Sequence, residues 1–243
     1  MTLGLRRRRL APVVLMLALA AVFTLLGGWQ LQRRAWKLQL IEDVEARIHA
    51  PPQPAPPPSR WRRISPRDAY RRVRVHGAYL GPETLVQAVT ELGGGSWVLS
   101  PLRTDAGWTV LVNRGFVPPE RRGAAAHAPP AGVVAVTGLL RTSEPGGGFL
   151  RRNAPGEGRW YSRDVAAIIR AQGLGPAAPY FIDAEAAPDP SAFPVGGLTV
   201  VRFPNSHLAY ALTWFALAAL SLAGAWVVGR TGGPGARSGP PLG

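Results

Sequence analysis

The stretch Ala11–Trp29 reads APVVLMLALAAVFTLLGGW and contains no charged side chain. Near the other end of the chain, Leu208–Gly229 reads LAYALTWFALAALSLAGAWVVG and is also uncharged. A helix needs roughly 20 apolar residues to cross the hydrocarbon core of a bilayer, and both stretches reach that length. The sequence therefore predicts two membrane-spanning helices that hold one polar, water-exposed domain between them.

The charges beside the two stretches predict how the chain lies in the membrane. Arg6–Arg9 precede the first stretch, Arg230 and Arg237 follow the second, and every acidic residue lies between the two. The positive-inside rule then places both termini in the cytoplasm. The predicted location is the cytoplasmic (inner) membrane, as a multi-pass protein with a periplasmic central domain. That domain is basic too, but long translocated domains are largely exempt from the rule.

A cleaved signal peptide is the alternative for the first stretch, because a basic segment precedes it and Ala18–Ala20 resembles a cleavage site. The apolar region of a signal peptide usually has only about 7–15 residues. Here the apolar run continues to Trp29, and Arg33 and Arg34 follow it. A retained anchor is therefore the favoured interpretation.

The composition limits the chemistry of the chain. There is no cysteine, which excludes disulfides, thiolate metal sites and cysteine nucleophiles. The formal net charge of +14 is typical of some nucleic-acid-binding proteins. However, Lys37 is the one lysine, and basic residues beside membrane spans are better explained by anionic lipid head groups. Membrane lipid is thus an expected partner, and nucleic acid is not.

Apolar residues recur every three or four positions from Leu31 to Val44, which predicts that the first span continues as a helix beyond the membrane. The prolines of residues 51–58 end it. In order, the predicted segments are a basic cytoplasmic tail (1–9), transmembrane helix 1 (10–30), a helical extension (31–50), a proline-rich linker (51–60), a periplasmic β-rich domain (61–206), transmembrane helix 2 (207–229) and a disordered cytoplasmic tail (230–243).

Alternating apolar residues predict several strands between the spans. They lie at Val73–Ala78, Thr84–Val89, Trp97–Leu102, Thr109–Val112, Val133–Leu140 and Tyr180–Asp183. One short helix is predicted over Arg163–Gln172, with Ser162 as its N-cap. This spacing favours an antiparallel sheet or a small open barrel. The predicted fold class is a two-span α-helical membrane anchor with an intervening α+β, mainly antiparallel β, extracytoplasmic domain.

The usual catalytic motifs are missing from the sequence, including the nucleophile elbow, the paired-histidine zinc motif and the phosphate-binding glycine loop. His49, His76 and His127 lie far apart in sequence, and His127 falls in an Ala/Pro-rich loop that is expected to be solvated. Glu157 and Asp164 are a candidate carboxylate pair, but Asp164 is better explained by a helix N-terminus. The sequence therefore predicts a non-enzymatic protein.

A group of polar and aromatic residues in the domain is a candidate partner surface. Part of it closes a strand in Asn113-Arg114-Gly115-Phe116-Val117-Pro118, which fits either a buried bend or a fixed surface for a partner or an anionic group. The bend is favoured for this segment. The candidate surface consists of Asn113, Arg114, Phe116, Trp160, Tyr161 and Arg163.

His207 stands at the mouth of the second span. An ionisable residue at membrane depth is a functional candidate by default, and neutral imidazole is a common ligand of metals and haem iron. Helical periodicity places His207 on one face with Tyr210 and Trp214, while Phe215 falls on a bulkier face suited to lipid. The alternative is an interfacial histidine within an aromatic belt.

The first span should leave the membrane at the same level as His207, through Gly27, Gly28 and Trp29. Small residues let helices approach closely, or leave room for a flat ligand. These three residues, His207 and Trp214 are therefore expected to lie near one another.

Five motifs, in order along the chain, resemble the surfeit locus protein 1 family. They are Gly28-Trp29-Gln30-Leu31-Gln32-Arg33-Arg34-Ala35-Trp36-Lys37, Gly77-Ala78-Tyr79, Leu111–Pro118, Trp160-Tyr161 with Arg163-Asp164, and Pro204–Phe215. The Asn-Asn-His pattern common in the family is Asn205-Ser206-His207 here.

The resemblance implies an assembly factor for haem–copper cytochrome c oxidase, with transiently bound haem a as cofactor. It implies that His207 ligates the haem iron at the outer membrane face. On this hypothesis Trp29, Tyr210 and Trp214 pack against the macrocycle, and Gly27 and Gly28 make room for it. Arg33 or Arg34 would pair with the propionates, since arginine suits carboxylates. The expected partners are oxidase subunit I and haem A synthase.

Three alternatives remain open. The chain could be a scaffold that stabilises an oxidase assembly intermediate without haem. It could be a membrane-anchored periplasmic enzyme, which a cluster of His, Asp and Arg in a deep domain pocket would favour. A protein that binds lipid or quinone is the weakest of the three.

Overall fold

The computed structural model describes residues 2–123, 127–148, 151–189, 191–199 and 205–230, with side chains from residue 10 onward. It divides into two compact units, residues 43–201 and the two terminal segments on either side of them. Each unit is described by itself. The predicted tail at 230–243 lies outside the described residues except for Arg230, and so does Pro204 of the last sequence motif.

The terminal unit is built from two helices. Helix α1 is Thr2–His49 and helix α3 is His207–Arg230. Both are long and apolar enough to cross a membrane. The helix predicted beyond Trp29 is present, because α1 is continuous to His49. It also begins at Thr2, so the segment predicted as a tail is helical.

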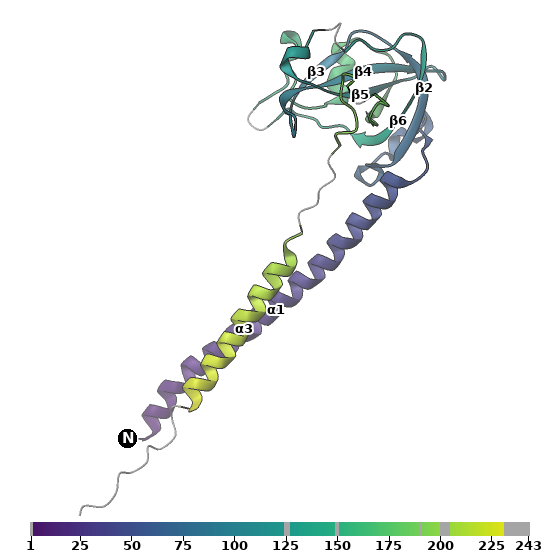
Figure 1. Cartoon of the computed structure of the whole chain (residues 1–243). Helices are drawn as coiled ribbons and strands as arrows, with labels where there is room; N and C mark the ends of the chain where they lie inside the picture. The colour runs from purple at the N-terminus through teal and green to yellow at the C-terminus, as the bar shows by residue number, and fades with distance from the viewer. Residues whose placement is uncertain (1, 124–126, 149–150, 190, 200–204, 231–243) are drawn as a thin grey trace, which may run out of the picture. The chain divides into compact units, whose positions relative to one another are not determined.

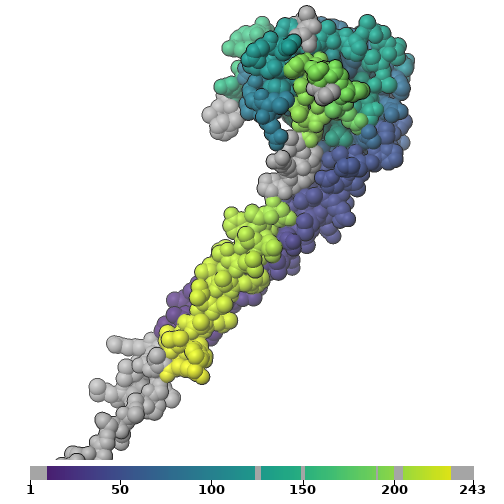
Figure 2. Space-filling view, in the orientation of Figure 1, coloured from purple at the N-terminus to yellow at the C-terminus, as the bar shows by residue number. Residues whose placement is uncertain are grey.

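Small residues line the contact between α1 and α3, which lie side by side in Figures 1 and 2. Ala20 of α1 is buried, as are Ala211, Ala218 and Ala225 of α3 at seven-residue spacing. A Cβ placed on Gly27 would lie 2.6 Å from the ring of Phe215. The assignment of Phe215 to a lipid-facing side was therefore wrong, because its ring packs over the glycine of the neighbouring helix.

The domain of residues 43–201 is made mainly of strands joined by turns and 3-10 helices (Figure 1). Its strands are β1 (Gln53–Pro54), β2 (Arg72–Tyr79), β3 (Thr84–Thr90), β4 (Gly93–Thr104), β5 (Thr109–Val117), β6 (Val133–Thr142) and β7 (Ala177–Ala184). Its helices are η1 (Pro58–Arg63), η2 (Pro66–Asp68), η3 (Pro119–Arg121), η5 (Pro155–Glu157) and α2 (Val165–Ala171).

The sheet is mixed and closes on itself. Its order is β1-β2-β6-β7-β5-β4-β3, and an additional β2–β4 pairing joins Gly77–Tyr79 to Leu102–Thr104. The pairs β1–β2 and β5–β7 are parallel, and the others are antiparallel. Closure depends on Gly77, because a Cβ there would overlap the carbonyl of Arg103. The sequence suggested an antiparallel sheet or a small open barrel, whereas the strands form a mixed sheet that is closed.

Alternating side chains divide the core into two clusters. Val110, Val112, Tyr180 and Ile182 belong to the first cluster, together with residues of β2, β4 and β6. Leu111 and Phe181, their alternate neighbours, belong to the second cluster with Val165 and Ile168 of α2. Strands β5 and β7 are therefore buried on both faces, as expected for a parallel pair covered by a helix.

Two local predictions were wrong. Helix α2 is shorter than predicted, and Asp164 is its N-cap, accepting a hydrogen bond from the amide of Ala167 at 3.0 Å. The proline-rich segment is attached to the domain rather than being a free linker: most of its residues are exposed, but Ala55 is buried, and the carbonyl of Pro56 accepts from Tyr180 Oη at 2.8 Å.

Candidate functional site

His207 at the start of α3 is paired with a side chain of α1. Its Nδ1 lies 2.8 Å from Oε1 of Gln30. Because an amide oxygen can only accept, the proton of this hydrogen bond belongs to Nδ1. In the neutral imidazole, Nε2 then keeps its lone pair. Histidines that ligate metals almost always donate their second ring N–H to such a partner, and the half-buried His207 has the same arrangement.

The predicted neighbours of His207 fall into two groups. Trp29 and Tyr210 are each 56% exposed, so both offer free aromatic surface. A Cβ on Gly28 would meet nothing within 4 Å, whereas the space beside Gly27 is filled by Phe215. Trp214 stacks on Phe23, with ring centroids 5.6 Å apart. Gly27 and Trp214 therefore serve the packing of the two helices in this structure.

Arg33 and Arg34 lie on α1 beyond Gln30. The guanidinium of Arg33 lies 4.2 Å from the centroid of the Trp36 ring, on the same helix. Arg33 is exposed and Arg34 is half-buried.

The candidate partner surface of the domain is largely interior, which corrects that prediction. Phe116 and Trp160 are buried, and Asn113 is buried with its Nδ2 donating to Oδ1 of Asp183 at 2.8 Å. Tyr161 is half-buried under the guanidinium of Arg151. These side chains form a buried bend, the alternative that the sequence favoured for the segment at Asn113.

The carboxylate of Asp183 accepts hydrogen bonds from several side chains around this bend. Besides Asn113, its carboxylate accepts from Arg141 at 2.9 Å and from Arg163 at 3.2 Å. Burial by itself would lower the pKa of Arg163, but the hydrogen bond to Glu144 and the charge of Asp183 outweigh burial and raise that pKa. Arg163 is therefore a structural cation of the domain core.

A second buried cluster surrounds Glu83. Arg114 donates to its Oε1 at 2.6 Å, Ser100 donates to the same oxygen at 2.8 Å, and Nδ1 of His127 lies 2.6 Å from its Oε2. His127 is 4% exposed, so the expectation that it is solvated was wrong. Its Nε2 faces the carbonyl of Arg122 at 3.2 Å, so both ring nitrogens are engaged within the fold.

Sequence reasoning did not assign a role to Gln30. It is the first strongly polar residue after the apolar run, one position beyond Trp29. Gln30 ends the first apolar run and His207 begins the second helix, so the expectation that these two ends lie near each other would have indicated the contact.

The chain is of the class that has an apolar helix near each end of the sequence and a closed, mixed β domain between them in sequence. A sequence model of the SURF1 family matches residues 17–219. The chain is 38% identical to surfeit locus protein 1 of Homo sapiens, covering 80% of this chain and 69% of the human one. It is 35% identical to a SURF1-like protein of Monosiga brevicollis, covering 89% and 87%. The chain belongs to the SURF1 family.

Proposed function

We propose that this protein is a non-enzymatic assembly factor for haem–copper cytochrome c oxidase. In this proposal it holds haem a at the His207 end of its two helices and aids its insertion into subunit I. The pairing of His207 with Gln30 carries the proposal, because it leaves Nε2 free to ligate iron. Membership of the family supports the oxidase as the assembly target.

The residues around His207 fit a flat aromatic ligand in part. Trp29 and Tyr210 supply exposed rings, and Gly28 leaves open space beside α1. Arg33 and Arg34 would pair with the propionates, as guanidinium groups bind carboxylates in a two-bond geometry. Gly27 offers no such open space, because the ring of Phe215 lies beside it.

The proposed topology places both termini in the cytoplasm and the β domain in the periplasm. The basic residues at the two ends support it through the positive-inside rule. In this arrangement the His207 end of α3 lies at the outer membrane face. There it would receive haem a from haem A synthase and deliver it to subunit I.

The test is the visible spectrum of the full chain, purified in detergent after co-expression with haem a biosynthesis. We expect a haem a spectrum that His207→Ala abolishes. The matched control His49→Ala changes an exposed histidine of α1 and should keep the spectrum. Gln30→Leu should lower haem affinity by about 10- to 100-fold, the usual effect of losing a partner of a ligating histidine.

Other outcomes separate the alternatives. If the wild-type protein carries no haem, yet the oxidase fails to assemble in its absence, the protein is a scaffold. If His207→Ala retains haem, the ligand lies elsewhere and the role of His207 is wrong.

A further inference from the structure

The segment of residues 60–74 is unusually basic. It contains seven arginines, and Asp68 is its one acidic residue. In the fold this segment forms η1, η2 and the start of β2. The last turns of α1 lie beside it, since Arg47 donates to the carbonyl of Arg67 at 2.9 Å.

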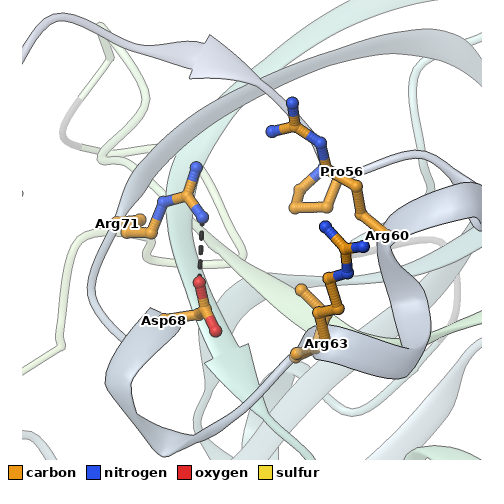
Figure 3. Close-up of a pocket in the computed structure, with 6 residues that line it drawn as sticks. Pro56, Arg60, Arg63, Asp68 and Arg71 are labelled. Carbon is orange, nitrogen blue, oxygen red and sulfur yellow. Dashed lines mark hydrogen bonds and ion pairs between the residues drawn. The ribbon is translucent and has the colours of Figure 1, made fainter.

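Part of this segment surrounds a cavity of about 180 Å³. The cavity is lined by Pro56, Arg60, Arg63, Ile64, Asp68 and Arg71. Figure 3 shows the guanidinium groups of Arg60, Arg63 and Arg71 directed toward the space between them. Three cationic groups therefore face one carboxylate.

The carboxylate of Asp68 is already engaged. It accepts from Arg71 at 2.9 Å and from the Ser65 amide at 3.0 Å. Burial alone would raise the pKa of Asp68, but these hydrogen bonds outweigh burial and lower it. Within the described part of the chain, the guanidinium groups of Arg60 and Arg63, two exposed residues, have neither a hydrogen bond nor an ion pair. The cavity thus has an uncompensated positive charge.

The wall that carries these arginines is fixed to the core. The carbonyl of Pro56 accepts from Trp61 Nε1 at 3.1 Å and from Tyr180 Oη at 2.8 Å. The Trp61 ring also packs edge-on against Trp108, with centroids 5.8 Å apart. Because Trp61 lies between Arg60 and Arg63 on η1, the backbone that presents both arginines is held in place before any ligand binds.

We propose that this cavity binds a phosphate group, with Arg60 and Arg63 as its main ligands. Guanidinium groups match phosphate oxygens in planar, two-bond contacts, and a doubly charged anion would balance the excess charge. The phosphate could come from the head group of an anionic phospholipid or from a free phosphate compound. This site is separate in sequence from His207 and does not depend on the proposed haem site.

The test measures binding of inorganic phosphate to the full chain in an uncharged detergent by isothermal titration calorimetry. Arg60→Gln/Arg63→Gln should weaken binding by at least about ten-fold, because both main ligands lose their charge and their paired N–H donors. The control Arg62→Gln/Arg67→Gln removes the same charge from exposed residues of the same segment, outside the cavity lining, and should bind like the wild type.

Absence of phosphate binding to the wild type, or equal losses in the two double variants, would overturn the proposal. Thermal melts of both variants ensure that a loss of binding does not reflect unfolding. A second arm repeats the titration in nanodiscs of phosphatidylcholine with and without phosphatidylglycerol. If phosphatidylglycerol prevents the binding of inorganic phosphate to the wild type, the cavity binds the phosphate of a lipid head group. If the binding persists unchanged, the cavity binds a free phosphate compound.

Discussion

Replacing Asp183 by asparagine should strongly destabilise the β domain. The carboxylate is 5% exposed and accepts from Asn113, Arg141, Arg163 and Thr199. Asparagine keeps the shape but removes the charge, and its NH₂ group would face donors. Breaking a buried ion pair costs about 3–5 kcal/mol. Since Arg141 and Arg163 both retain Glu144, the lower value, about 3 kcal/mol, is expected.

The measurement is a thermal melt of the full chain in detergent, followed by near-UV circular dichroism. For a domain of this size, about 3 kcal/mol corresponds to a fall in Tm of roughly 6–12 °C. The control Asp189→Asn changes an exposed carboxylate and should stay within about 0.5 kcal/mol of the wild type. If the two variants melt at the same temperature, Asp183 is not the structural centre that the contacts indicate.

Three further predictions concern the same domain. Glu83→Gln should lower the free energy of unfolding by about 2–3 kcal/mol in a denaturant titration, because it leaves Arg114, whose side chain is only 10% exposed, without its carboxylate. Gly77→Ala should cost about 1–3 kcal/mol by forcing β2 away from β4, whereas Gly94→Ala, which has open space, should be tolerated. Burial raises the pKa of Tyr79 to about 12. The unfolded chain releases this proton near pH 10, so stability should fall as pH rises from 10 to 12, and less steeply in Tyr79→Phe.

The sequence predicted strands where side chains alternate, but it missed features that depend on distant partners. The strand predicted at Thr109–Val112 continues as β5 to Val117. The predicted strand ended at Val112, just before the polar residue Asn113. Its amide is satisfied by Asp183, seventy positions later, and no local pattern shows this. Strand β1 was missed for a similar reason, because its short, proline-containing backbone becomes a strand only by pairing with β2.

The burial of His127 could not be predicted from the sequence either, because it also depends on residues that are distant along the chain. Its loop has the composition of a solvated segment, and nothing near it in sequence predicts burial. Its ring is buried because Glu83 and Arg114 reach it from other parts of the chain: Glu83 contacts Nδ1, and Arg114 donates to the carbonyl of His127 at 2.6 Å. By contrast, the proximity of His207 to the end of the first span was predictable, since two helices of similar apolar length that meet side by side bring their ends together.

The residues that carry the family resemblance differ in what the structure requires of them. In the domain, Asn113 and Trp160 are buried, so packing and hydrogen bonding account for their presence. In the helix pair, Trp29 and Tyr210 are more than half exposed, so contacts within the chain do not account for their presence. Both rings lie on the helices that carry Gln30 and His207, whose side chains are paired. The helix pair, rather than the β domain, is therefore where a loss of function without a loss of stability should first be sought.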